Sequence, residues 1–184
     1  TPELTLVRWL SDGAMGSVWA AELGPERRPV AVKLIHGKKI RDRGTLRRFE
    51  REAAAASKIQ SPHVVQIISY GTAFDDAPYI VMELLEGETL GRRLERVGKL
   101  SLDDTAAILK QVGKALSAAH DLGIIHRDIK PENIFLVGMD DFPLVKVLDF
   151  GMAKHVGPIR AGEDSLITAT GVAVGTPEYM SPEQ

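Results

Sequence analysis

The chain has 184 residues, of which 44% are hydrophobic and 26% are charged, and its formal net charge is −2. This composition is typical of a globular protein with an apolar core, and the small net charge argues against a general nucleic-acid or membrane-surface binder. No apolar run approaches the roughly 18 residues of a membrane span. From the charge and the lack of such a run, we expect neither a nucleic-acid partner nor membrane contact from this segment.

The first third of the chain predicts three short strands. Runs that contain Val, Leu and Trp extend from Leu4 to Leu10, from Ser17 to Leu23 and from Pro29 to Ile35. Gly24-Pro25 marks a turn between the second run and the third.

A helix and two further strands are expected next. Residues Arg41 to Ile59 are charged, rich in alanine and spaced as in a helix, and Pro62 ends this stretch. The runs from Val64 to Tyr70 and from Tyr79 to Glu83 predict strands around a polar turn at Asp75-Asp76. The apolar face of the helix consists of Leu46, Phe49, Ala53 and Ala56.

A longer helix is predicted further along the chain. Ser101 and Asp104 form a start that is similar to a capping box. The helix runs to about Leu122, and Gly123 suits its C-terminal cap. Its buried face is expected to contain Ile108, Val112, Ala115, Leu116 and Ala119.

The remaining segments divide the chain into two parts. Gly87 marks a joint, and the boundary between a strand-rich lobe and a helical lobe is expected near Leu85 to Glu88. Ile134 to Val137 and Val145 to Leu148 predict two short strands. From His155 to Gly175 the chain is polar, glycine-rich and aperiodic, and a loop of this length in a compact domain is usually functional.

The segment from His126 to Asn133 reads His-Arg-Asp-Ile-Lys-Pro-Glu-Asn. Asp128 can accept a proton from an attacking hydroxyl, Lys130 can steady a phosphoryl group in transfer, and Asn133 can hold a metal ion. The segment resembles the catalytic loop of protein kinases, which has these residue types at these spacings. The alternative interpretation is a charged turn after a helix.

The resemblance extends from Leu10 to Gln184 and is greatest to the bacterial eukaryotic-like (Hanks-type) serine/threonine kinases. It implies one protein kinase domain over residues 1–184, with an α+β, bilobal fold. The N-lobe, residues 1–85, would be an antiparallel sheet with one helix. The C-lobe, residues 86–184, would be mainly helical and incomplete at its C-terminus, with Glu183 exposed because its partner in the family lies further along the chain.

Within this resemblance, Leu10 to Val18 corresponds to the glycine-rich loop that covers the phosphates of ATP. Glycines let backbone N–H groups approach phosphate oxygens. Ser11 stands where the family has its first glycine, so only Gly13 and Gly16 remain. The alternative interpretation of this segment is a plain hairpin turn.

Val30-Ala31-Val32-Lys33 is similar to the third strand of the family, and implies that Lys33 contacts the α- and β-phosphates of ATP. Glu52 resembles the helix glutamate that pairs with this lysine, and its place ten residues before Pro62 favours it over Glu50. A solvent-facing lysine and a surface glutamate are the alternatives.

Asp149-Phe150-Gly151 resembles the metal-binding tripeptide of the family. The resemblance implies that Asp149 and Asn133 hold Mg²⁺, or Mn²⁺ as the alternative ion. Oxygen ligands suit Mg²⁺, which uses few protein ligands together with phosphates and water. His126 is expected to be buried behind this segment, and the other histidines form no metal-binding spacing: His36, His63, His120 and His155.

The adenine ring of ATP is expected between the lobes. By resemblance, Met82 lies at the rear of the pocket, and the backbones of Glu83 and Leu85 form hydrogen bonds with adenine. The residues expected to enclose the ring are Val18 and Ala31 from above and Phe135, where leucine is commoner, from below. Each of the side chains assigned to this pocket could equally be an ordinary core residue.

Two segments imply the substrate class. Lys130, two residues after Asp128, is typical of serine/threonine kinases rather than tyrosine kinases. Thr176 resembles the substrate-docking threonine of that class, and Ser181-Pro-Glu183 stands for the usual Ala-Pro-Glu. We therefore expect ATP and serine- or threonine-containing proteins as partners.

The loop after Asp149 contains hydroxyls that could control the enzyme. Thr168 and Thr170 are expected to be autophosphorylated, with Ser165 as a further candidate, and a phosphate there could pair with Arg127. A dimer that phosphorylates itself in trans is the expected assembly. The lack of cysteine fits the cytoplasm, and a membrane-anchored full-length protein with a cytoplasmic kinase domain is the alternative. The alternatives are solvated loop hydroxyls and, for the whole chain, a non-catalytic nucleotide-binding pseudokinase, which Ser11 favours, or an inactive kinase fragment.

Overall fold

The computed structural model describes residues 3–13, 16–36, 43–73, 77–138 and 143–150 together with Tyr179. The chain divides into two compact units. The first unit contains residues 1–60 and 65–85, and the second contains residues 61–64 and 86–184. Each unit is described by itself.

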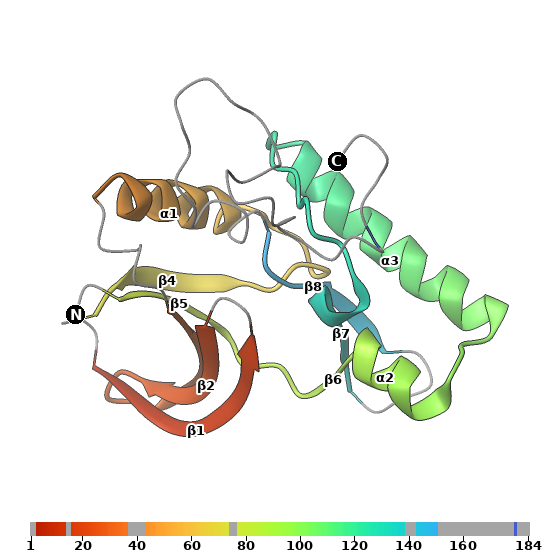
Figure 1. Ribbon diagram of the computed structural model, residues 1–184, viewed down its shortest axis with the longest axis horizontal. Helices are drawn as coiled ribbons and strands as arrows, with labels where there is room; N and C mark the ends of the chain where they lie inside the picture. Colours follow the sequence, from red (N-terminus) through yellow and green to blue (C-terminus); the bar gives the residue numbers. More distant parts are fainter. Residues whose placement is uncertain are drawn as a thin grey trace, which may run out of the picture. The chain divides into compact units, whose positions relative to one another are not determined.

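The first unit is a five-stranded antiparallel sheet with one helix (Figure 1). Its strand order is β1-β2-β3-β5-β4. Helix α1 contacts β4 and β5 and buries Phe49, Ala53 and Ala56, whereas Leu46 of the predicted face is half-buried. The elements are β1 (Leu4–Gly13), β2 (Gly16–Leu23), β3 (Arg28–Ile35), α1 (Arg43–Ala56), β4 (Ile67–Thr72) and β5 (Pro78–Glu83).

The register of this sheet gives it two distinct faces. Side chains alternate along a strand, and directly paired residues share a face. Val18 pairs with Lys33, and Ala31 pairs with Met82, so these four residues form one face, which we call the Lys33 face. The opposite face, which we call the Val32 face, carries a buried cluster of Ala21, Val30, Val32 and Val81.

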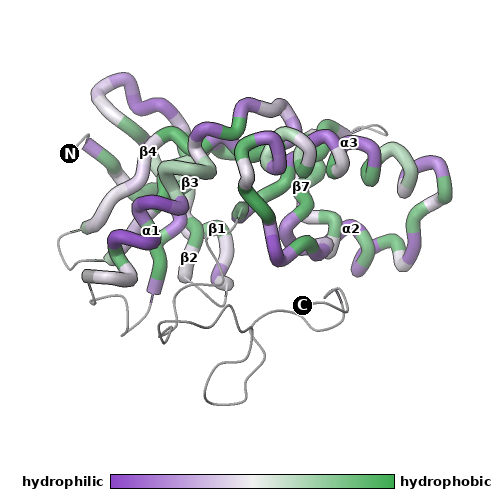
Figure 2. The backbone as a smooth tube through the Cα atoms, turned by 90° about the horizontal axis from the view of Figure 1, so that it is seen from above, coloured by the Kyte–Doolittle hydropathy of each residue, from purple (hydrophilic) through white to green (hydrophobic). Residues whose placement is uncertain are grey.

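The second unit has a three-stranded antiparallel sheet of order β6-β7-β8 and two α-helices in its described part. Helix α3 packs on β8, and α2 packs beside β6, β7 and η1. Figure 2 shows that β7 is hydrophobic throughout, which fits a strand between two neighbours. The elements are β6 (Gly87–Thr89), α2 (Leu90–Val97), α3 (Leu102–His120), the 3₁₀ helix η1 (Pro131–Asn133), β7 (Ile134–Val137) and β8 (Leu144–Val147).

Residues Ser61–Val64 lie between α1 and β4 in the sequence but belong to the second unit. The backbone of His63 accepts a hydrogen bond from Val147 N at 2.8 Å, and Nδ1 of the His63 ring lies 3.1 Å from the carbonyl oxygen of Val145. Val64 forms a parallel bridge with Val147. The predicted strand from Val64 was therefore wrong at its start, since β4 begins only at Ile67.

Helix α3 confirms its predicted start. The Ser101 side chain accepts a hydrogen bond from Asp104 N at 3.0 Å and donates to Asp104 Oδ2 at 2.6 Å. The helix ends at His120. Gly123, three residues further on, adopts a positive φ of 71° and donates its N–H to the His120 carbonyl. The prediction of Leu116 as buried was wrong: it is half-buried, beside the buried Ile108, Val112, Ala115 and Ala119.

Other boundaries differ from the prediction for local reasons. Strand β1 continues beyond Leu10 to Gly13, because Asp12 and Gly13 pair with β2. Helix α1 ends at Ala56, three residues before the predicted Ile59, in a tightened turn in which Lys58 donates to Ala55 O. The predicted turn at Asp75-Asp76 lies outside the described residues. Among the described helices, none is long and apolar enough to cross a membrane.

Helix α2 and strand β6 were not predicted. The helix has no buried residue, which weakens its periodic signal. Its caps are nevertheless readable in the sequence, because Thr89 Oγ1 accepts from Arg92 N at 3.2 Å and Gly98, with a φ of 79°, donates to Leu94 O. Both caps are of types that commonly begin and end helices.

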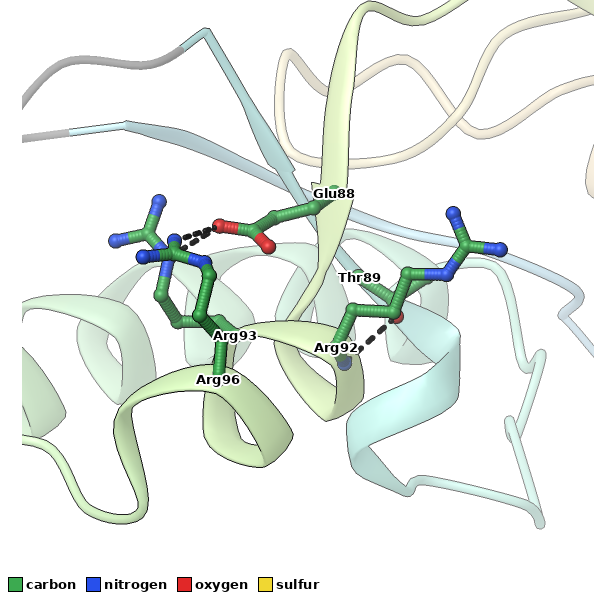
Figure 3. A network of polar contacts seen from close by, with 5 residues as sticks. All are labelled: Glu88, Thr89, Arg92, Arg93 and Arg96. Atoms are coloured by element: carbon green, nitrogen blue, oxygen red, sulfur yellow. Dashed lines mark hydrogen bonds and ion pairs between the residues drawn. The ribbon is translucent and has the colours of Figure 1, made fainter.

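An ion-pair network joins β6 to α2 (Figure 3). Arg93 Nε donates to Oε1 of Glu88, and Arg96 Nη2 donates to the same oxygen at 2.6 Å. The hydrogen bonds from Arg96 and Arg93 hold the pKa of Glu88 below its ordinary value, so the carboxylate stays charged at neutral pH. Figure 3 shows Arg92 pointing away from this network.

We expect Glu88→Gln to lower the free energy of unfolding by up to about 1 kcal/mol at neutral pH, because a partly exposed network contributes little. A carboxylate with a lowered pKa stabilises the fold above its ordinary pKa and loses that contribution as pH falls through the lowered value. Urea unfolding should therefore show the difference between variant and wild type shrinking in acid and in high salt. Glu95→Gln, on the exposed side of the same helix, is the matched control and should change nothing.

Candidate functional site

The predicted catalytic side chains of the second unit lie together in the loop before β7. Asn133 Nδ2 donates to the backbone oxygen of Asp128 at 2.7 Å and to its Oδ2 at 3.1 Å. Lys130 Nζ lies 3.3 Å from the same Oδ2. Within the described part of the chain no group donates to Oδ1 of Asp128. The carboxylate is therefore held by one oxygen and presents the other as an acceptor for a hydroxyl proton.

The carboxamide of Asn133 has its orientation fixed by these contacts. Both oxygens of Asp128 that it meets are acceptors, so Nδ2 must face them and Oδ1 must point away. Asn133 exposes only 8% of its surface, and no described residue donates to its Oδ1. A buried amide oxygen in this state fits a hard cation such as Mg²⁺ as its missing partner.

The backbone of Leu148 connects this loop to Asp149. Leu148 N donates to Asn133 O at 2.9 Å, and Leu148 O lies 2.7 Å from Nε2 of His126. Asp149 follows with a positive φ of 57°, a left-handed conformation that aspartate tolerates better than most residues. The predicted metal ligands Asn133 and Asp149 are thus tied to neighbouring backbone positions. Among the described residues, no group of three or more His, Cys, Asp or Glu side chains could hold a metal ion.

His126 is a structural residue, as expected. It exposes 2% of its surface, its ring meets that of Phe150 edge-on at 4.8 Å, and its Nδ1 accepts from Asp128 N at 3.2 Å. Because Nδ1 is an acceptor, the ring proton is on Nε2, which donates to Leu148 O. Burial lowers the pKa of His126, although the Leu148 carbonyl and the charges of Asp149 and Asp128 oppose this.

The glycine-rich segment of the first unit is a β-hairpin. Gly13 pairs with Gly16 across the turn, and Ser11 pairs with Val18 inside the ladder. Gly16 has a φ of 153°, and a Cβ built on it would lie 1.8 Å from the carbonyl oxygen of Leu34. A Cβ on Gly13 would meet nothing closer than 3.9 Å. Gly16 is thus required by the contact with β3, whatever else it binds.

Lys33 and the candidate glutamates lie in the first unit. Lys33 is half-buried on β3, between Val18 of β2 and Ile80 of β5. On α1, Glu52 is half-buried and Glu50 is exposed. The exposed side chain is the poorer candidate for a partner of a half-buried lysine, so the burial favours Glu52.

The residues predicted to contact adenine are divided between the units. Glu83 donates its N–H to Gln66 O at 3.0 Å and accepts from Gln66 N at Oε1, so both its backbone and its side chain are tied to Gln66. Leu85 makes no backbone hydrogen bond to any other described residue. Phe135 is half-buried on β7, where it pairs with Thr89 and Lys146.

Several predicted residues lie outside the part of the chain that the structure describes. These are Gly151 of the metal-binding tripeptide, the candidate phosphorylation sites Ser165, Thr168 and Thr170, and Thr176 and Ser181-Pro-Glu183 of the docking segment. Conversely, motif reading missed Gln111 of α3, whose side chain accepts from Val145 N at 3.0 Å and donates to Pro143 O at 3.2 Å. A single polar residue on a helix gives no sequence signal for such a clamp on β8.

Comparisons with known proteins show which family this chain belongs to. The family model described as protein kinase domain matches residues 4–184. Serine/threonine-protein kinase pkn3 of Myxococcus xanthus is 40% identical over 176 residues, which is 95% of this chain and 32% of that protein. Serine/threonine-protein kinase PknH of Mycobacterium bovis is 41% identical over 179 residues, which is 97% of this chain and 28% of that protein.

Solved structures with a similar fold are also kinase domains. The crystal structure of the Mycobacterium tuberculosis PknI kinase domain matches with a TM-score of 0.71 and 31% identity, over 82% of this chain and 60% of that one. The chain spans less than half of the length of the curated relatives named above, 32% of one and 28% of the other.

We expect Gly16→Ala to lower the free energy of unfolding by more than about 1 kcal/mol, because the new Cβ collides with Leu34 O and the backbone conformation is unfavourable for alanine. Gly13→Ala is the matched control and should change the free energy by less than this. Thermal or urea unfolding without any nucleotide measures both. Equal effects of the two substitutions would contradict the structural role of Gly16.

The lowered pKa of His126 predicts a loss of stability in mild acid. Above about pH 6.5 the ring is neutral in both the folded and the unfolded chain. As pH falls below that value the unfolded chain takes up the proton first, so the free energy of unfolding decreases until the lowered pKa is reached. Urea unfolding between about pH 8 and about pH 5.5 should show this slope, and His126→Phe should flatten it. An unchanged slope in the variant would contradict the assignment.

Proposed function

This chain belongs to the protein kinase family, and we propose that it transfers the γ-phosphoryl group of ATP to the hydroxyl of a serine or threonine in a protein. The observation that carries the proposal is the Asp128 carboxylate, whose Oδ2 is held by Asn133 and Lys130 while Oδ1 meets no described donor. A carboxylate held in this way can orient a hydroxyl and accept its proton.

The residues divide the chemistry between them. Asp128 positions the attacking hydroxyl, and Lys130 offsets negative charge that develops on the transferred group. Lys33, on the same face as Val18 and Ala31, neutralises phosphate charge, and the N–H groups of the glycine hairpin bind phosphate oxygens. Asn133 and Asp149 would hold Mg²⁺, which neutralises phosphate charge when bound.

Recognition of the adenine base is assigned to a separate set of residues. The backbones of Glu83 and Leu85 are the hydrogen-bonding groups proposed for the base. Val18, Ala31 and Met82 share the Lys33 face and would contact the base, with Phe135 of β7 contributing from the second unit. Glu52 is proposed as the ion-pair partner of Lys33.

The substrate class and control are also proposals. Lys130 favours serine and threonine, and the relatives that match this chain are named serine/threonine-protein kinases. Autophosphorylation of Thr168, Thr170 or Ser165 in trans, within a dimer, would regulate the enzyme, and an ATP-dependent enzyme without cysteine is expected to work in the cytoplasm. Mg²⁺ is the preferred ion over Mn²⁺.

A non-catalytic pseudokinase is the alternative function. Ser11 in the glycine hairpin is the observation that favours it. Against it, the sequence retains Lys33, Asp128, Asn133 and Asp149, and a protein that only bound nucleotide would not need the Asp128 carboxylate.

We expect Asp128→Asn to reduce phosphoryl transfer by at least about a hundredfold, since general-base catalysis typically contributes this much, while nucleotide binding survives. Mass spectrometry after incubation with Mg²⁺ and ATP would locate phosphate on Thr168 or Thr170 in the wild type. Asp121→Asn, at the exposed end of α3, is the matched control and should retain activity.

Transfer that persists in Asp128→Asn would refute the catalytic assignment. Nucleotide binding by a wild-type chain that transfers no phosphate, even when extended at its C-terminus, would support the pseudokinase.

A further inference from the structure

The beginning of β2 contains a buried hydroxyl that none of the proposed phosphate contacts uses. Ser17 exposes 5% of its surface and is the one buried polar side chain among the described residues of the first unit. Its Oγ accepts a hydrogen bond from Trp19 Nε1 at 3.0 Å and lies 3.3 Å from Nε2 of His36. Because Trp19 can only donate, the Ser17 hydroxyl proton is available to the His36 ring nitrogen.

Trp19, Ser17 and His36 form a hydrogen-bonded set that we call the relay. It lies on the face of the sheet opposite the proposed nucleotide contacts. Ser17 pairs with Leu34, and Val18 pairs with Lys33. Side-chain alternation therefore places Ser17 and Trp19 on the Val32 face, and the contact with Ser17 brings the ring of His36 there, while Val18 and Lys33 occupy the opposite face. A change in the relay can move the hairpin without touching any group that faces the nucleotide.

A second observation shows that the same arm of the hairpin is fixed to β3. Gly16 approaches the backbone of Leu34 so closely that a Cβ would lie 1.8 Å from its carbonyl oxygen. Residue 16 is thus held by a close backbone approach, and residue 17 by side-chain hydrogen bonds to residues 19 and 36.

We propose that Ser17 is a positioning residue for the nucleotide, which holds the second arm of the glycine hairpin on the end of β3 through His36, while Trp19 of the same arm fixes the orientation of the Ser17 hydroxyl. The inference rests on the proposed function, because it assumes that the hairpin binds phosphate. Backbone N–H groups bind an anion tightly only when they converge before it arrives, so a looser arm weakens binding without altering the groups that perform the transfer.

The experiment uses the two tryptophans of the chain, Trp9 and Trp19, which pair across the hairpin. Trp9, which is 50% exposed, is replaced in Trp9→Phe so that emission reports on Trp19 alone. In this background Ser17→Ala, Ser17→Thr, His36→Ala and the Ser17→Ala/His36→Ala double variant are titrated with Mg²⁺ and the non-hydrolysable analogue AMP-PNP. Ser69→Ala, a half-buried hydroxyl on β4 without a side-chain bond to any described residue, is the matched control.

We expect Ser17→Ala and His36→Ala each to weaken analogue binding roughly two- to tenfold, as loss of one hydrogen bond allows. The double variant should be no weaker than the worse single variant, and Ser17→Thr and Ser69→Ala should bind as the background does. In transfer assays KM for ATP should rise while kcat stays constant.

Two results would overturn the inference. If the background protein binds the analogue and transfers phosphate but Ser17→Ala binds equally well, or if the two single effects are additive, the relay does not position the nucleotide. If the background protein neither binds the analogue nor transfers phosphate, the proposed function fails and the inference fails with it.

Discussion

The place of Asp149 beside the Asp128 loop depends on the peptide groups of one residue, Leu148. Its N–H binds the backbone of Asn133 and its C=O binds the ring of His126, so the residue that follows is fixed relative to the Asp128 loop. The same histidine accepts from Asp128 N, which links the two acidic residues through one neutral imidazole. A buried backbone group must find a partner, and here the partners are the residues that the chemistry needs nearby.

In the first unit the corresponding constraint is strand register. The pairings of Val18 with Lys33 and of Ala31 with Met82 collect residues from three strands on one face. A shift of register by one residue would send Lys33 to the opposite face, where Val32 now packs with Val81. The close approach of Gly16 to Leu34 opposes such a shift, because few other residues fit there.

Sequence reasoning succeeded where local chemistry decides the structure. The cap at Ser101, the strands of the first sheet and the cluster of Asp128 with Asn133 follow from residue types and spacing. It failed where long-range contacts decide. Val64 has the composition of a β4 residue but pairs with Val147, Leu116 is only half-buried, and α2 buries none of its residues. The clamp made by Gln111 has no local pattern at all.

Ser61–Val64 has a consequence for how the protein can be divided. Because these residues belong to the second unit, the chain passes between units at 60/61, at 64/65 and at 85/86. Neither unit is therefore a continuous stretch of polypeptide. A fragment cut at Leu85 would carry His63 and Val64 away from the strand that binds them, and the complementary fragment would expose the edge of β8. The units are unsuited to separate expression or exchange between relatives as simple cassettes, and a single proteolytic nick between them would leave two covalent connections intact.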